Sequence, residues 1–266
     1  TGSTTKSDET NDPRNTADSH GNQQPTGDGD SSSSSTAKTT PGTEVANTNN
    51  SVGQTNGVIS ISVSVKKIEM TVVYESLCPY SRRFVYGQLL PVFSKLGSFI
   101  SLTMLPFGKA RVRNETDGQG NIITRISCQH GENECVGNKI ETCVLRVVKQ
   151  TLTAVKIVAC MSQNSSPHTA GQSCVETNGV KWSQIDACVR QHGDEYELEV
   201  AKTTWSYQNV VTRVPLIIVD GDKGNYVNYV AQTSLMTLAC RQIEVDGNTE
   251  PEPCAQERRR RRRRRR

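Results

Sequence analysis

The chain has 266 residues, 34% of them hydrophobic and 5% aromatic, and its formal net charge is +4. That length suits one ordinary domain with extensions, and no apolar run approaches the roughly 20 residues that span a bilayer, so the sequence predicts no transmembrane segment. The positive charge comes from nine consecutive arginines, the first Arg258 and the last Arg266. Without them, 22 Lys and Arg face 27 Asp and Glu, which gives a net charge of −5.

The arginine run predicts a cationic tail, residues 255–266, that does not fold on itself because its like charges repel. A polycation of this kind attracts anionic glycans, anionic lipid or nucleic acid. The sequence leaves these partners open, together with the alternative of an engineered tag or an incidental low-complexity end.

Residues 1–57 consist mainly of Ser, Thr, Asn, Gly and Asp, and residues 31–35 are five serines. Such a segment buries too little apolar surface to offset the entropy of ordering it. We therefore expect a disordered stalk, either glycosylated or without a role of its own. At its border, residues 58–65 alternate apolar and polar side chains, which predicts an edge strand.

The next predicted elements form a continuous unit. Residues 67–74 are rich in β-branched and apolar side chains and predict a strand that leads to Cys78. Residues 82–93 carry apolar side chains at helical spacing, and residues 99–106 predict a second strand. Strand, turn, helix and strand in this order are the opening βαβ unit of a thioredoxin-like α/β fold.

The turn before the predicted helix reads Cys78-Pro79-Tyr80-Ser81. A cysteine where a helix begins is stabilised as the thiolate by the free N–H groups and the helix dipole, and only the thiolate attacks disulfides. In a redox pair the second thiol stands three residues later, and here that position holds Ser81, whose hydroxyl cannot release a mixed disulfide. The sequence thus favours a reactive thiol without a resolving partner over an inert, buried cysteine.

The other cysteines are even in number, which predicts four disulfides and an oxidising compartment, so that we expect a secreted or endolysosomal protein. They are Cys128, Cys135, Cys143, Cys160, Cys174, Cys188, Cys240 and Cys254. Their pairing does not follow from the sequence, although Cys240 and Cys254 are placed to close the C-terminal end together.

A zinc site is the competing interpretation of Cys128, His130, Cys135 and Cys143. Structural zinc sites use closely paired ligands, and the spacings of seven and eight residues here do not match them. We therefore predict no metal and no cofactor, and we expect His130 to be a structural hydrogen-bonding residue. Three glycosylation sequons, at Asn49, Asn114 and Asn164, agree with secretion, although Pro167 makes the last a poor acceptor.

Residues 142–161 and 182–200 predict two further helices, the second interrupted near Gly193. Cysteines on both predict that bridges tie these helices together.

A β-branched strand at residues 210–220 is entered through Val214-Pro215. Glycines and polar residues then predict a hairpin turn to a strand at 226–230, and residues 233–243 predict a closing helix.

The segment from Cys128 to Cys143 reads C-Q-H-G-E-N-E-C-V-G-N-K-I-E-T-C. It resembles the signature of the gamma-interferon-inducible lysosomal thiol reductase (GILT) family, C-Q-H-G-x-x-E-C-x-x-N-x-x-x-x-C, at every fixed position. The resemblance covers roughly residues 66–254 and implies a GILT-like domain at 58–254, a thioredoxin-like core with an inserted, disulfide-bonded helical subdomain at about 127–205.

The resemblance also assigns roles. Family members carry a C-x-x-C pair, of which only the first position is kept here, at Cys78, so the chain is a divergent member with C-x-x-S. Val214-Pro215 resembles the cis-proline loop that faces the active cysteine, and implies that the Val214 backbone binds an extended substrate.

Two functions follow from these features. The first is a secreted GILT-like protein with impaired or lost reductase activity that acts mainly by binding disulfide-containing or cell-surface proteins. The second is a monothiol oxidoreductase or isomerase that acts on protein disulfides through Cys78. The missing thiol at Ser81 and the arginine run favour the first, and whether the chain is an enzyme stays open.

Overall fold

The computed structural model describes residues 65–207, 211–264 and 266. The stalk expected at residues 1–57 and all but the last residue of the strand expected at 58–65 lie outside this part of the chain.

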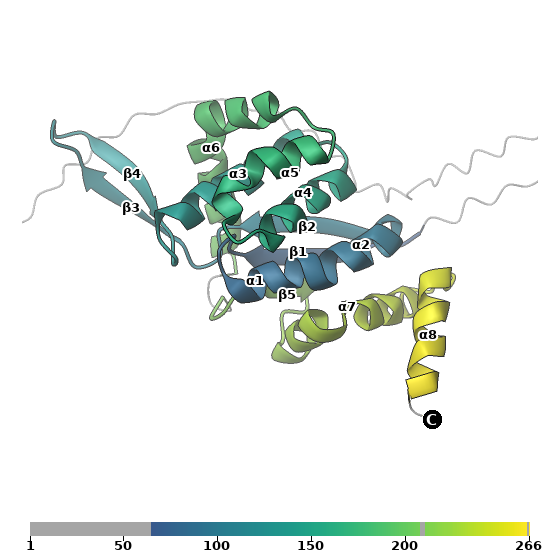
Figure 1. Cartoon of the computed structure of the whole chain (residues 1–266). Helices are drawn as coiled ribbons and strands as arrows, with labels where there is room; N and C mark the ends of the chain where they lie inside the picture. The colour runs from purple at the N-terminus through teal and green to yellow at the C-terminus, as the bar shows by residue number, and fades with distance from the viewer. Residues whose placement is uncertain (1–64, 208–210, 265) are drawn as a thin grey trace, which may run out of the picture. The chain divides into compact units, whose positions relative to one another are not determined.

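A three-stranded sheet forms the core, with the strands in the order β2-β1-β5 (Figure 1). β1 (Ile68–Tyr74) pairs in parallel with β2 (Ile100–Pro106) and antiparallel with β5 (Leu216–Val219). Five of the seven residues of β1 are buried, whereas Glu69 is exposed and Thr71 is half-buried. The predicted strand–helix–strand unit is confirmed.

The connection between β1 and β2 is helical but not uniform. It consists of α1 (Pro79–Phe84), a π-helical turn η1 (Val85–Leu89), α2 (Leu90–Leu96) and a 3₁₀ turn η2 (Gly97–Phe99). Pro91 explains the irregularity, because it has no N–H to donate to the preceding turn.

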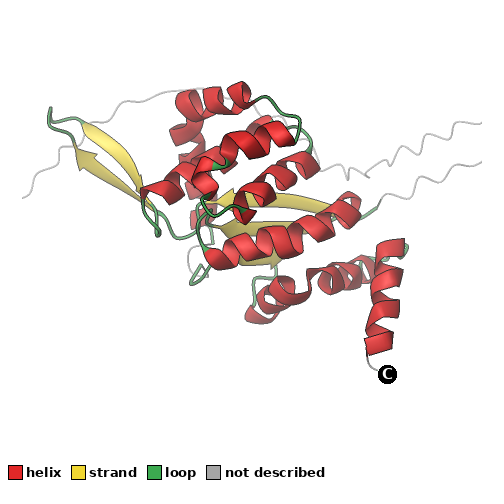
Figure 2. Ribbon diagram, viewed as in Figure 1, coloured by secondary structure: helices red, strands yellow, loops and turns green. Residues whose placement is uncertain are grey.

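An antiparallel hairpin, β3 (Arg111–Thr116) and β4 (Ile122–Ser127), follows the core strands and was not predicted (Figure 2). Most of its side chains are exposed, so its sequence lacks the apolar alternation that marks a half-buried strand. Asp117 closes the turn by accepting hydrogen bonds from the N–H groups of Gln119 and Asn121 at 2.9 and 2.8 Å.

The helical insertion consists of four α-helices and one 3₁₀ turn. They are α3 (Glu132–Val147), α4 (Thr151–Gln163), η3 (Pro167–Thr169), α5 (Gly171–Thr177) and α6 (Trp182–Trp205). The single helix expected at 142–161 is wrong, because Val148 is extended and separates α3 from α4. The interruption expected near Gly193 is wrong too: α6 continues through Gly193, where a Cβ would lie 2.7 Å from Cδ of Lys139 on α3.

Four disulfides join the helices and loops. Cys143–Cys188 connects α3 to α6, Cys160–Cys174 connects α4 to α5, Cys128–Cys135 ties the loop before α3, and Cys240–Cys254 closes the C-terminal end. All nine cysteines lie in the described part of the chain, and Cys78 is the one left free. The zinc alternative is therefore wrong, because Cys128, Cys135 and Cys143 all form disulfides.

The C-terminal part differs from the prediction. The chain turns tightly after β5, with Asp220 at φ 48° and Gly221 at φ 81°, and then forms α7 (Asn225–Val245) instead of a hairpin and a strand at 226–230. Gly224 is the N-cap of this helix, which explains why the turn residues start a helix rather than a strand. α7 is kinked at Ser234.

The last element, α8 (Glu252–Arg264), extends through most of the arginine run. The expectation that this run does not fold on itself is therefore wrong for those residues. The Cys240–Cys254 disulfide fixes the start of α8, and Arg258 and Arg259 form ion pairs with Glu250 and Glu252 at 2.7 and 2.6 Å. Among the described residues, none of the helices combines the length and apolarity that a bilayer crossing requires.

Candidate active site

Cys78 lies at the N-cap of α1, and residues 75–77 separate it from the end of strand β1. Pro79 occupies the first helical turn, where its missing N–H and fixed φ suit the helix. The Cys78 carbonyl accepts a hydrogen bond from Arg82 N–H at 3.0 Å, which closes the first turn. Cys78 is 5% exposed and therefore buried, whereas Tyr80, two residues further along the chain, is 71% exposed.

The loop before β5 faces this thiol. The Val214–Pro215 peptide is cis, and the Cys78 thiol donates a weak hydrogen bond to the Val214 carbonyl at 3.8 Å. The structure therefore brings together Cys78 and the loop that the sequence analysis singled out, although 136 residues separate Cys78 from Val214.

Ser81 is fully buried beneath the turn. Its hydroxyl accepts a hydrogen bond from the backbone N–H of Glu75 at 3.3 Å. This side chain thus braces the end of β1 against α1. Arg82, the next residue, reaches the end of α4, where its Nε and Nη2 donate to the carbonyls of Ser162 and Asn164 at 2.9 and 2.5 Å.

The signature residues of α3 pack directly behind the turn. The Ser76 N–H donates to Oδ1 of Asn138 at 2.9 Å, and its hydroxyl donates to the Glu134 carbonyl at 3.1 Å. A Cβ at Gly137 would lie 2.5 Å from the Ser76 hydroxyl, so this close approach requires glycine. The helical insertion therefore positions the segment that carries Cys78, two residues after Ser76.

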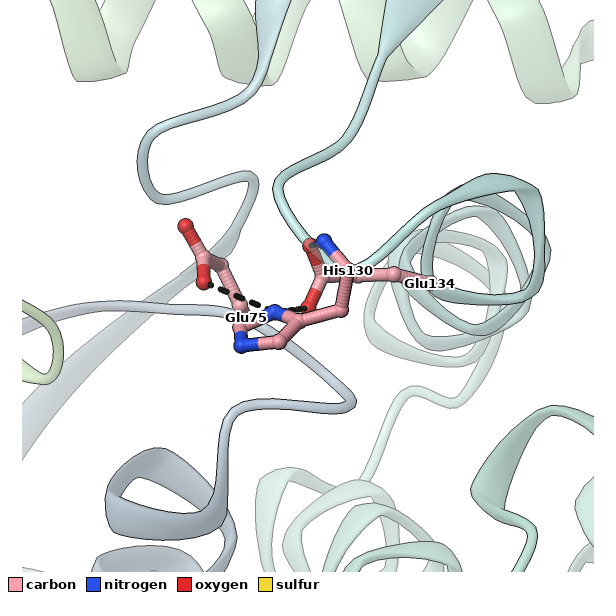
Figure 3. A group of neighbouring side chains, drawn as sticks. All are labelled: Glu75, His130 and Glu134. Atoms are coloured by element: carbon pink, nitrogen blue, oxygen red, sulfur yellow. Dashed lines mark hydrogen bonds and ion pairs between the residues drawn. The ribbon is translucent and has the colours of Figure 1, made fainter.

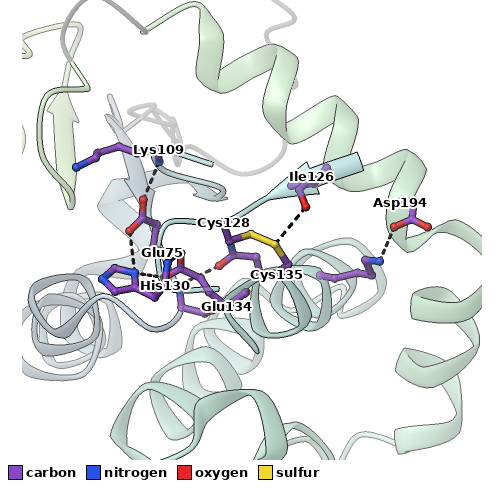
Figure 4. Close-up of a disulfide and its surroundings, with 11 residues drawn as sticks. Glu75, Lys109, Ile126, Cys128, His130, Glu134, Cys135 and Asp194 are labelled. Atoms are coloured by element: carbon purple, nitrogen blue, oxygen red, sulfur yellow. Dashed lines mark hydrogen bonds and ion pairs between the residues drawn. A yellow bond between two sulfur atoms is a disulfide. The ribbon is translucent and has the colours of Figure 1, made fainter. Parts of the chain in front are cut away.

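His130 lies between two buried carboxyl groups, Glu75 and Glu134 (Figure 3). Its Nδ1 is 2.5 Å from Oε2 of Glu134 and 3.5 Å from Oε2 of Glu75. The Cys128–Cys135 disulfide closes the short loop that holds His130, and Figure 4 shows it beside the cluster. Burial raises the pKa of Glu75; the Lys109 N–H, donating at 2.7 Å, lowers it in part, and the Glu134 carboxylate raises it further.

A third buried carboxyl, Glu141 on α3, lies near the Tyr74 hydroxyl at the end of β1. Neither its oxygens nor Oη of Tyr74 has a close hydrogen-bond partner among the described residues. Burial raises the pKa of Glu141 to about 8, and the nearby Tyr74 hydroxyl and Arg82 offset part of that rise. Burial likewise raises the pKa of Glu197 on α6 to about 7.

Because their pKa values are raised, Glu141 and Glu197 are expected to make the folded state less stable as the pH rises above about 5. Above its ordinary pKa of 4.5, Glu141 ionises in the unfolded chain but keeps its proton in the folded one up to about pH 8. The folded state binds the extra proton, so the free energy of unfolding falls as pH rises through this window, by at most about 1.4 kcal/mol per pH unit for one proton. Urea unfolding of the natural chain and Glu141→Gln at several pH values should give a shallower fall for the variant.

The control for that measurement is Glu195→Gln, because Glu195 is exposed on α6 and forms only a loose pair with His192. It should keep the slope of the natural chain. Equal slopes in Glu141→Gln and the natural chain would contradict the assignment.

Sequence reasoning named Cys78, Ser81, Val214 and Pro215, and the structure brings them to one end of the sheet. It missed Glu75, whose partners come from distant loops, so that no local pattern marks it. Of the sequon residues, Asn114 on β3 and Asn164 after α4 are exposed, and Asn49 lies outside the described residues.

A parallel strand–helix–strand unit, a free cysteine at the helix start and a cis-proline loop before an antiparallel strand define the class. The fold is α/β and thioredoxin-like, with a disulfide-bonded helical insertion. A solved thioredoxin-like oxidoreductase from Silicibacter pomeroyi is similar at 11% identity and a TM-score of 0.41, over 59% of this chain and 77% of that one.

Comparison with known sequences gives the family. The family model described as "Gamma interferon inducible lysosomal thiol reductase (GILT)" matches residues 69–178. A gamma-interferon-inducible lysosomal thiol reductase of Carassius auratus is 31% identical over 192 residues, 71% of this chain and 72% of the relative. GILT-like protein 1 of Drosophila melanogaster is 28% identical over 215 residues, 75% of this chain and 83% of the relative. The chain belongs to the GILT family.

Proposed function

We propose that this chain performs thiol–disulfide exchange on protein disulfides with a single thiol, that of Cys78. The observation that carries the proposal is the position of this free cysteine, at the start of α1 and opposite the Val214 carbonyl, with a buried serine where a second thiol would stand. The attacking group of a thiol reductase is thus retained, and the group that would release the product internally is not.

The first step is attack by the Cys78 thiolate on one sulfur of a substrate disulfide. The substrate S–S bond breaks, a Cys78–substrate disulfide forms, and the displaced substrate thiolate takes up a proton. A second substrate thiol can then displace Cys78, which rearranges the substrate disulfides without net redox change. Net reduction instead needs two small external thiols: one displaces the substrate from Cys78, and the second frees Cys78 and leaves oxidised small thiol.

The surface around Cys78 suits an extended substrate segment. The Val214 backbone lies against the sulfur, and the side chain of Tyr80, two residues after Cys78, is exposed. We infer that substrate binds along the Val214–Pro215 loop by backbone pairing, with Tyr80 as an apolar contact. Because Cys78 is 5% exposed, only a disulfide that docks on this face meets the sulfur.

We propose a secreted or endolysosomal location. Four disulfides in one domain favour an oxidising compartment, and the Carassius auratus relative is named a lysosomal protein. Glycosylation at the exposed Asn114 or Asn164 agrees with that location.

Trapping tests the proposal. The natural chain, incubated with a disulfide-bonded protein such as insulin and no small thiol, should accumulate an adduct that mass spectrometry locates at Cys78. Addition of glutathione should cleave this mixed disulfide and release the insulin. Cys78→Ser should give no adduct, and reduced and alkylated insulin should give none with the natural chain. The proposal is wrong if the natural chain forms no adduct, or if the adduct persists in Cys78→Ser.

A second candidate is noncovalent binding to protein or cell-surface partners, and one observation favours it: Arg258 and the following six arginines are exposed on α8. Nine arginines attract anionic glycans, lipid or nucleic acid in a salt-dependent way. The same incubation separates the two candidates. A complex that survives in Cys78→Ser, but is lost at high salt or after deletion of residues 258–266, supports binding rather than exchange.

A further inference from the structure

We propose that the Glu75–His130–Glu134 cluster binds a divalent cation of the zinc class, a function beyond thiol exchange and one that the sequence analysis did not predict. One carboxylate oxygen of each glutamate and Nδ1 of His130 lie within 4.8 Å of one another. The three side chains come from the end of β1, the loop before α3 and the first turn of α3, and they point toward one another (Figure 3).

The two carboxyl groups are oriented for single-oxygen coordination. Oε1 of Glu75 accepts a hydrogen bond from the Lys109 N–H at 2.7 Å, and Oε1 of Glu134 accepts one from the His130 N–H at 3.0 Å. Each backbone donor fixes one oxygen and leaves Oε2 of the same group facing Nδ1 of His130. In metal sites, the atoms of a ligand that do not bind the metal usually form hydrogen bonds that hold the ligand in its orientation.

One of these oxygens, Oε2 of Glu75, is buried with no group in the described part of the chain that replaces its hydration. Both glutamate side chains are 0% exposed, and Oε2 of Glu75 has no hydrogen-bond partner among the described residues. An ionised carboxylate in such a place needs a positive partner. A divalent cation at the centre of the cluster would supply that charge to both carboxylates at once.

The donor set indicates which cation. One imidazole nitrogen and two carboxylate oxygens suit zinc, which takes four ligands at about 2.0–2.2 Å, whereas Mg²⁺ and Ca²⁺ prefer six or more oxygens. Tetrahedral bonds of that length separate ligand atoms by about 3.3 Å. The Nδ1–Oε2 distance of 3.5 Å to Glu75 is near that value, and the 2.5 Å distance to Glu134 would open as the metal replaces the Nδ1 proton.

The cluster is accessible from one side. The His130 side chain is 32% exposed, so solvent reaches the cluster there and supplies water as the fourth ligand. The Cys128–Cys135 disulfide holds the loop of His130 in place, which limits the reorganisation that binding requires (Figure 4). Because these two cysteines are bonded to each other, they do not compete as ligands.

Zinc titration tests the proposal. The full chain carrying Cys78→Ser, which removes the free thiol as a ligand, should bind one Zn²⁺ in competition with a chromophoric chelator. Glu75→Gln and His130→Gln in that background should each weaken binding at least about tenfold, since even outer-shell partners change affinity by about 10–100-fold. Mg²⁺ should not compete.

His192→Gln is the matched control. His192 and Glu195 also form a His–Glu pair, with a 3.5 Å Nδ1–Oε2 distance, but this pair is exposed and lacks a second carboxylate. The variant should keep the full affinity. The proposal is overturned if the Cys78→Ser chain binds no Zn²⁺. It is also overturned if the variant that adds Glu75→Gln binds Zn²⁺ as tightly as the Cys78→Ser chain.

A spectroscopic measurement keeps the test decisive if the cluster variants do not fold. X-ray absorption at the zinc edge of the Cys78→Ser chain, loaded with one equivalent of Zn²⁺, should show a nitrogen and oxygen shell with one imidazole and no sulfur. A shell with sulfur, or with two or more imidazoles, would assign the metal elsewhere and refute the site.

Discussion

Ser81→Cys is expected to raise the rate of insulin disulfide reduction by about tenfold or more at millimolar external thiol, because a thiol held beside the mixed disulfide acts at an effective concentration far above millimolar. In the natural chain, only an external thiol can resolve the mixed disulfide at Cys78. In the variant a second sulfur stands three residues away on the same helical turn and completes the C-x-x-C pair. Turnover with glutathione, measured by insulin precipitation, gives the comparison.

The buried position of Ser81 sets the side effects of this change. The variant loses the hydroxyl that accepts the Glu75 N–H at 3.3 Å, a loss of about 1 kcal/mol for one hydrogen bond. Ser94→Cys, which places a new thiol at an exposed position of α2, is the control and should leave turnover unchanged. Equal rates for the natural chain and Ser81→Cys would mean that external thiols already release Cys78 without delay, and that the absent sulfur is not limiting.

The parts of the fold that the sequence predicted correctly are those with a strong local pattern. β1 and β2 each end in a run of buried apolar residues, and the Cys78-Pro79 turn marks the start of the helix between them. Errors occurred where tertiary context decides. Residues 142–161 contain no proline and carry apolar side chains on both sides of Val148, so nothing in their pattern marks the break there. Residues 226–230 contain strand-forming side chains, yet Gly224 caps a helix there.

The candidate site divides in the same way. Cys78 and Ser81 are recognisable from four adjacent letters, and the signature from Cys128 to Cys143 is recognisable as a pattern. What the signature does is not readable from its letters. Only the folded chain shows that Asn138 and the Glu134 backbone hold Ser76, and that Glu75 completes a cluster with His130.

Removing the Cys143–Cys188 disulfide is expected to cost about 4 kcal/mol of stability, from the entropy of a 45-residue loop in the unfolded chain. Both cysteines are buried, and the ion pairs that also join α3 to α6, Lys139–Asp194 and Arg146–Glu199, lie at the surface where such pairs contribute little. The Cys143–Cys188 disulfide is the covalent link between α3 and α6. Urea unfolding of the double variant Cys143→Ala/Cys188→Ala, without reductant, measures the loss.

The matched control is Cys240→Ala/Cys254→Ala, whose 14-residue loop predicts a smaller loss of about 3 kcal/mol. The two variants should differ in a second respect. α3 carries Asn138 and Glu134, which hold the active-site turn through Ser76, whereas the C-terminal bridge lies between α7 and α8. Loosening α3 should therefore expose the buried Cys78 and accelerate its alkylation under native conditions, and loosening α8 should not. A larger loss of stability from the C-terminal pair, or equal alkylation rates, would show that the insertion does not hold the turn.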